Sequence, residues 1–109
     1  MPTKSSMTCS RNDVVLLPIP FTDLTSRKVR PAIVIGGKGA DLFVVPISSV
    51  LANTDFALQE WQAAGLNVAS GVKAQLATVE DRLIVKIIGR ITAVDREALD
   101  EKLRAWLQL

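Results

Sequence analysis

Histidine is absent from this chain of 109 residues. This absence excludes acid–base catalysis by histidine and the Ser-His and Cys-His nucleophile pairs. It also excludes nearly all known types of zinc hydrolase site, which use histidine as a ligand. Cysteine occurs once, at Cys9, which excludes an internal disulfide framework and a multi-cysteine zinc site and is typical of a reducing compartment. Carboxylate-bound Mg²⁺ stays open in principle, but no closely spaced acidic motif stands out, and we expect neither a metal nor a cofactor.

Long apolar runs are also missing, as are most aromatic residues. No segment approaches the roughly 20 apolar residues of a membrane helix, and the N-terminal residues lack the apolar core of a secretory signal. We therefore expect a cytoplasmic protein without membrane contact. With three phenylalanines, two tryptophans and no tyrosine, the chain has few side chains on which the bases of a single strand could stack.

The chain does contain enough apolar sequence for one core, together with a small positive charge. Apolar residues make up 49% of the chain, which argues against global disorder and fits one domain. We expect a flexible polar leader at residues 1–11 and a single domain at residues 12–109. Thirteen basic and eleven acidic residues give a net charge of +2, which still permits one basic face.

Five segments have the composition and alternation of β-strands. They are residues 14–17, 32–35, 42–47, 71–78 and 82–91. The glycine-rich residues 36–39 predict a hairpin turn between the second and third strands, and Gly89 predicts a bend or bulge in the last one. In the fourth strand, the alternation places Lys73 and Gln75 on the wetter side.

Two helices are predicted. Residues 53–66 carry apolar side chains at helical spacings and include Gly65, which is a good helix terminator. A C-terminal helix begins at Thr92, where Thr92 and Asp95 are similar to a capping box. Its apolar stripe consists of Val94, Leu99, Leu103, Trp106 and Leu107. These elements predict an α+β, mainly β fold: a small, strongly bent antiparallel sheet of about five strands with a short mid-chain helix and a C-terminal helix.

The most informative segment lies between the first two strands. A polar loop there begins with two prolines and ends with Arg27, Lys28 and Arg30. Arg30 is followed by Pro31, so its backbone is stiff at the mouth of the second strand. A basic loop beside a fixed arginine suits the binding of an anion.

Four segments, taken in order, resemble the MazF/PemK (Kid-like) toxins of type II toxin–antitoxin systems. They are DVVLLPIPFTDLTSRKVRPAIVI, LFVVPISS, EWQAAGLNVASGVKAQLATV and IIGRITAVDREALDEKLRAWL, and the resemblance covers roughly residues 12–108. It implies an SH3-like barrel, a homodimer, and a metal-independent, sequence-selective endoribonuclease that cuts single-stranded mRNA. It also implies a labile antitoxin that masks the site.

The resemblance further implies two catalytic residues. The arginine of the family's Arg-Pro motif matches Arg30, and the hydroxyl residue at the end of the third strand matches Ser48. The chain departs from the family pattern twice. Asn12 replaces a glycine, although asparagine also tolerates left-handed backbone angles. The hydroxyl residue is more often threonine, and serine lacks the methyl group that restricts χ1.

These residue types suit cleavage of RNA by its own 2′-hydroxyl group. The protein then needs no nucleophile, and it has to hold the strand and stabilise charge on the phosphorane-like transition state. The planar guanidinium of Arg30 offers donors to phosphate oxygens, and Ser48 can add a hydroxyl donor. Because a guanidinium keeps its proton in proteins, we assign Arg30 an electrostatic role rather than that of a general acid.

Six further residues are assigned to RNA binding. Contacts with phosphates, which position a strand without reading its sequence, are predicted for Arg27, Lys28 and Lys73. Base selection is predicted for Asp23, Thr25 and Gln75.

Other interpretations compete at several positions. Lys73 could belong to an ordinary solvated face, and Trp61, which could stack on a base, could instead fill the core. Asp13 is expected to form structural hydrogen bonds rather than act as a base, and Arg90 to pair with an acid.

Two alternative functions stay open. CcdB-like proteins share the barrel but poison DNA gyrase through their C-terminal residues, and here residues 106–109 are largely apolar while Arg30 and Ser48 would be idle. A non-catalytic member of the same fold would bind RNA or a protein without turnover.

Overall fold

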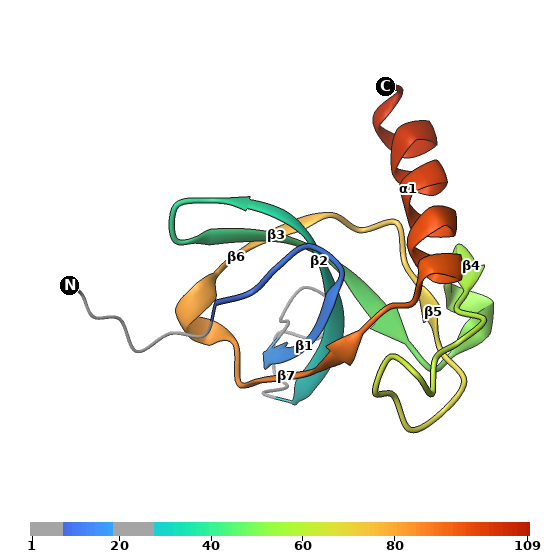
Figure 1. The fold of residues 1–109 in the computed structure, drawn as a ribbon, viewed down its shortest axis with the longest axis horizontal. Coiled ribbons are helices and arrows are strands. Elements are labelled where there is room, and N and C mark those ends of the chain that lie inside the picture. Colours follow the sequence, from blue (N-terminus) through green and yellow to red (C-terminus); the bar gives the residue numbers. More distant parts are fainter. Residues whose placement is uncertain (1–7, 19–27) are drawn as a thin grey trace.

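Strands dominate the part of the chain that the structure describes, where seven of them form one sheet and an α-helix follows (Figure 1). The structure is a computed structural model, and it describes residues 8–18 and 28–109. The strands are β1 (Asp13–Pro18), β2 (Val29–Lys38), β3 (Asp41–Ser48), β4 (Phe56–Ala57), β5 (Gly71–Val72), β6 (Ala77–Glu80) and β7 (Lys86–Arg90). The remaining elements are the 3₁₀ turns η1 (Leu51–Asn53) and η2 (Asp81–Leu83) and the helix α1 (Ala93–Leu107).

Five of the strands form a small barrel. Their order is β7-β1-β2-β3-β6, with antiparallel pairing throughout. The two outer strands of this series, β6 and β7, follow one another in the chain with only residues 81–85 between them. The sheet therefore has to curl until its two edges approach each other. The predicted α+β, mainly β fold is confirmed, and two short additional strands extend it: β5 pairs with β3, and β4 pairs with β5.

Both faces of the central strands are buried, which explains their rich content of branched apolar residues. Val14, Ile33 and Val45 are paired across β1, β2 and β3 and lie in one core cluster. The neighbouring positions, including Val15, Ala32, Val34 and Val44, lie in a second cluster on the opposite face. The strict alternation of strand side chains thus divides the apolar residues between two cores.

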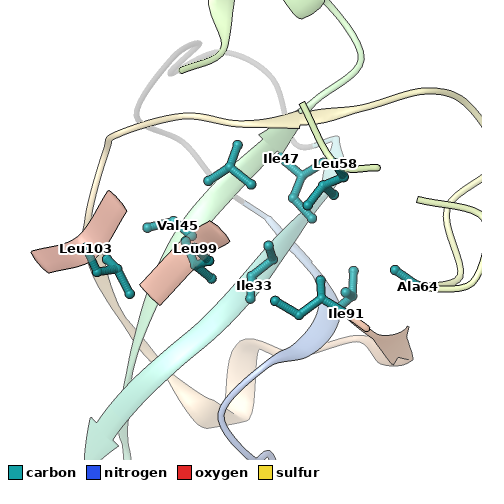
Figure 2. Close-up of a cluster of buried hydrophobic side chains, with 10 residues drawn as sticks. Ile33, Val45, Ile47, Leu58, Ala64, Ile91, Leu99 and Leu103 are labelled. Atoms are coloured by element: carbon teal, nitrogen blue, oxygen red, sulfur yellow. The ribbon is translucent and has the colours of Figure 1, made fainter. Parts of the chain in front are cut away.

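Helix α1 covers the first of these clusters. Leu99 and Leu103 lie against Ile33, Val45 and other buried side chains of the sheet (Figure 2). The helix ends at Gln108, which has a left-handed conformation (φ 58°) and donates its N–H to the last helical carbonyls. Within the described residues, no helix is long and apolar enough to cross a membrane.

Two residues of the apolar stripe predicted for α1 are exposed instead of buried. Val94 and Leu107 are 46% and 48% exposed, whereas Leu99 and Leu103 are buried and Trp106 is half-buried. For Val94 the cause lies in the first turn, where the side chain directed inward is that of its neighbour Asp95, only 1% exposed.

The helix predicted within residues 53–66 does not form. Asp55 and Leu58 donate backbone N–H groups to the carbonyls of Val72 and Ser70, so this part of the chain pairs with a neighbouring segment. Turns follow from residue 59 to residue 65. Helical spacing of apolar residues alone did not distinguish these turns from a helix.

The strand predicted at residues 71–78 is interrupted. Its two ends are β5 and β6, which pair with different parts of β3. Lys73 still follows the register of β5 with β3, because it donates its backbone N–H to Pro46. The chain leaves the ladder after it, where Ala74 donates its backbone N–H to the Asp55 carboxylate and Gln75 donates its own to Lys73.

The irregularity predicted at Gly89 is confirmed, but its strand is shorter than expected. The register of β1 with β7 shifts between Val14, which pairs with Gly89, and Val15, which pairs with Ile87. Residues 81–83 form η2 rather than strand. The hairpin predicted at residues 36–39 turns slightly later, at Gly39 (φ +62°), because β2 continues through Lys38.

Part of the predicted leader, residues 1–7, lies outside the described residues. At its end, Ser10 donates its backbone N–H to Asp13 and the Arg11 guanidinium pairs with Asp100 at 2.6 Å. These contacts place residues 10 and 11 against the domain.

The burial pattern of α1 leads to a test of stability. Leu99→Ala should lower the free energy of unfolding by about 2–5 kcal/mol, because it leaves a cavity between the helix and the sheet. Leu107→Ala should change it by no more than about 0.5 kcal/mol. Urea unfolding followed by circular dichroism measures both, and equal losses would contradict the packing described here.

Candidate functional site

A cleft of about 720 Å³ opens where β2, β3 and β7 come together. Its polar lining is drawn from the strand ends and from the loop before β5. These residues are Arg30, Ser48, Ser49, Asn67, Ser70, Lys73 and Lys86. The cleft therefore contains side chains from distant parts of the sequence, brought together by sheet pairing.

The pairing of β2 with β3 brings Arg30 and Ser48 to the same cleft. The ladder between the two strands ends at the pair Ala32 and Pro46, and Arg30 and Ser48 each lie two residues beyond it. Neighbouring strands are separated by about 4.8 Å, so this register places the two residues at adjacent positions on adjacent strands. Arg30 is exposed and Ser48 is half-buried. Their catalytic roles stay a prediction.

Ser48 is held by a hydrogen bond that leaves its proton available. Its Oγ accepts the backbone N–H of Val50 at 3.0 Å, which closes a short turn after β3. A hydroxyl that accepts one hydrogen bond can still donate its own O–H. The bond also restrains a side chain that lacks the β-methyl group of threonine.

Lys73 and Lys86 add two ammonium groups to the lining. Lys73 is half-buried directly after β5, where its backbone N–H is bonded to the Pro46 carbonyl at 3.0 Å. Lys86 begins β7 opposite Leu16 of β1. From the sequence, Lys86 was not predicted as a binding residue. A single charged residue inside the apolar run 84–88 is nevertheless a signal for an exposed strand position.

The cleft has cations but no acids among its described lining residues. Arg30, Lys73 and Lys86 carry positive charge, and none of the described ion pairs involves them. Arg90 is instead paired with Asp13 at 3.3 Å, which confirms the expected structural role of Asp13 and the expected pairing of Arg90. The described lining of the cleft thus favours negatively charged ligands.

One wall of the cleft is a loop that lies directly on β7. A Cβ atom at Gly65 would clash with the Ile88 carbonyl oxygen, and one at Gly89 would clash with the Ala64 carbonyl oxygen. Gly65 also has φ +95°, which strongly favours glycine. The close backbone contact brings residues 65–68 to the edge of the cleft.

Asp95 ties the same loop to helix α1. Its Oδ1 accepts the backbone N–H of Gln59 at 2.8 Å and its Oδ2 accepts that of Glu60 at 2.9 Å. The Thr92 hydroxyl is also hydrogen-bonded to the Glu60 carboxylate. The predicted capping box is therefore wrong, because both of its polar side chains bond to the loop instead of to the first turn of the helix.

Of the six predicted RNA-binding residues, Lys73 lines the cleft. Asp23, Thr25 and Arg27 lie outside the described residues. Lys28 is exposed but is not part of the cleft lining, and the same holds for Gln75. Trp61 packs against the core cluster, which favours the core interpretation of this side chain.

A second hollow, of about 570 Å³, differs in chemistry. It lies between the later part of α1 and residues of β2, β3 and β6, with apolar walls that include Phe43 and Leu107. Arg11 and Asp100 on its rim are paired with each other. Cys9 belongs to neither hollow, and burial together with Asp13 and Asp81 raises the pKa of its thiol, which disfavours the nucleophilic thiolate.

The fold and the cleft define a small β-barrel protein with a cationic groove at the ends of its strands. Residues 10–107 match the sequence model of the PemK-like, MazF-like toxins of type II toxin–antitoxin systems. Since this match spans nearly the whole chain, the protein belongs to that family, and the resemblance seen in the sequence is confirmed. Members of the family are known as endoribonucleases.

A solved structure supports the fold. The Mycobacterium tuberculosis toxin MazF-mt6 superimposes with a TM-score of 0.70 and 18% sequence identity, covering 89% of this chain and 97% of that chain. At this identity the similarity shows a shared fold. No curated protein sequence matches the chain significantly.

The Asp95 contacts predict a specific loss of stability. Asp95→Asn should cost about 1.5–3 kcal/mol, because a buried amide replaces a carboxylate that accepts two backbone hydrogen bonds. Asp100→Asn on the same helix is the matched control and should cost less than about 1 kcal/mol, since its ion pair is exposed to solvent. Urea unfolding of the two variants gives the comparison, and similar losses would exclude an anchoring role for Asp95.

Proposed function

We propose that this protein is a toxin that cleaves single-stranded mRNA in the cytoplasm without a metal ion and is neutralised by a cognate antitoxin. One observation carries the proposal: Arg30 and Ser48, to which the resemblance assigns catalytic roles, line a cleft whose described lining has three cations and no acids. A cleft of this kind suits a polyanion with a phosphodiester backbone.

The proposed reaction is the attack of a 2′-hydroxyl oxygen on the adjacent phosphorus, with cleavage of the bond from phosphorus to the 5′-oxygen. The products are a 2′,3′-cyclic phosphate and a 5′-hydroxyl group. The 2′-hydroxyl loses a proton and the leaving oxygen gains one. In the transition state the non-bridging oxygens gain negative charge, which the Arg30 guanidinium and the Ser48 hydroxyl would stabilise.

The side chains of the cleft suit this reaction better than metal-assisted hydrolysis. Its described lining has guanidinium, ammonium, hydroxyl and amide groups but no carboxylate, imidazole or thiol. Across residues 8–18 and 28–109, no group of three or more such ligands is arranged to hold a metal ion. The proposed chemistry therefore depends on positioning and electrostatic stabilisation by the protein.

Two protein partners complete the proposal. The family belongs to type II systems, in which the toxin has an antitoxin partner. We propose that an antitoxin protein binds this chain and that the toxin is a homodimer. Sedimentation of the purified protein alone measures whether it is a dimer, and sedimentation with the antitoxin measures whether the two proteins form a complex.

Cleavage of a long RNA tests the proposed mechanism. The wild-type protein should cut it in the presence of EDTA and leave a 2′,3′-cyclic phosphate at each cut site. Arg30→Ala should lower the rate by about a hundredfold or more, the loss typical of one transition-state donor. Ser48→Ala should lower it less, because it removes only a neutral donor. Arg96→Ala, an exposed arginine on α1, is the control and should leave the rate unchanged.

Four results would contradict this mechanism. A requirement for added Mg²⁺ would exclude the metal-independent reaction, and full activity of Arg30→Ala would exclude its central residue. Growth arrest with intact mRNA and trapped gyrase–DNA complexes would favour a CcdB-like function. RNA binding by a folded protein without cleavage would identify a non-catalytic member.

A further inference from the structure

Lys86 lines the cleft, but it is not among the residues to which the family motifs assign a role. We infer that Lys86 binds a substrate phosphate on the opposite side of Arg30 from Lys73, so that the cleft holds a run of three phosphates. This inference rests on the proposed function and adds the length of substrate that the cleft engages.

The strand order places the four groups in a row. Lys73 follows β5, Ser48 ends β3, Arg30 begins β2, and Lys86 begins β7. These strands lie in the order β5-β3-β2-β1-β7. Arg30 and Ser48 are therefore adjacent, with one lysine on each side of them.

The register also places the four groups within two residues of one another along the strands. Leu17 pairs with Arg30 on β2, and its neighbour Leu16 pairs with Lys86 on β7. The offset between Arg30 and Lys86 is thus one residue, or about 3.3 Å along the strands. Because successive strand residues alternate between the two faces, the two side chains line the cleft from opposite faces of the strand ends. On the other side, the Lys73 backbone is bonded to Pro46, two residues before Ser48.

Charge and distance both favour several phosphates over one. Each phosphodiester carries one negative charge, so one phosphate would leave two of the three cations without compensation. Lys73 and Lys86 are four strand positions apart, which is about 19 Å measured along the curled sheet at about 4.8 Å per step, and the straight line between them is shorter than this. Charge-assisted hydrogen bonds to phosphate require about 2.7–2.9 Å, so successive phosphates fit this spacing better than a single one.

The surroundings of Lys86 support a binding role over that of an ordinary surface lysine. Leu16 accepts the Val85 backbone N–H at 2.8 Å, which fixes the start of β7 against β1. Within the described chain, no acid forms an ion pair with Lys86. The side chain therefore presents its charge to the cleft from a fixed backbone position.

The test measures how binding depends on salt, with a labelled single-stranded oligonucleotide that has deoxyribose at every position and cannot be cut. Each phosphate contact with a single strand contributes about 0.7 to the slope of log K against log salt concentration. Lys86→Ala should lower the slope by this amount, and Lys86→Arg should restore it. Lys38→Ala, an exposed lysine outside the cleft, is the control and should leave the slope unchanged.

An unchanged slope for Lys86→Ala, in a protein that unfolds at the wild-type urea concentration, would overturn the inference. So would an equal decrease for Lys38→Ala. Because the probe is not cleaved, the result is independent of the proposed activity. A lowered slope without RNA cleavage by the wild type would uphold the phosphate contact and reject the ribonuclease. RNA cleavage by the wild type, together with an unchanged slope for Lys86→Ala, would support the ribonuclease and reject the phosphate contact of Lys86.

Discussion

The antiparallel register of β1, β2 and β3 determines both the core and the cleft. Val14, Ile33 and Val45 lie side by side in one apolar cluster because this register pairs them. The same register places Arg30 beside Ser48 at the ends of the strands. A shift by one residue would turn each strand over, and the buried faces on both sides make such a shift costly. The energy that specifies the core therefore also specifies the position of the polar groups in the cleft.

A second set of contacts holds the wall of the cleft. The loop before β5 has little regular structure, so its position depends on what it touches. Its backbone lies on β7 at Gly65 and Gly89, and the Asp95 carboxylate binds it from the helix. The division of roles is clear: the sheet positions the cations, while the loop and the helix together shape the space in front of them.

The sequence was informative where local pattern and long-range structure agree. The central strands and the C-terminal helix follow from apolar periodicity, and Arg30 and Ser48 follow from the family motifs at strand ends. The interruption of residues 71–78 could not be predicted, because it occurs where Ala74 donates its backbone N–H to the carboxylate of Asp55, which is distant in the sequence. For the same reason Asp95 resembled a capping residue: its true partners, Gln59 and Glu60, are distant in the sequence. Lys86 can be assigned to the cleft only when the pairing of β7 with β1 is known.

The order in which the chain is synthesised has a consequence for the cleft. Its charged and hydroxyl groups lie in separate segments between residues 30 and 86. A ribosome that has produced only the first three strands has made Arg30 and Ser48, but neither lysine of the cleft nor the strand that supports its wall. The cleft is complete only after residue 86 has emerged and β7 has paired with β1. For the proposed ribonuclease, this order means that a chain still under synthesis lacks part of the cleft.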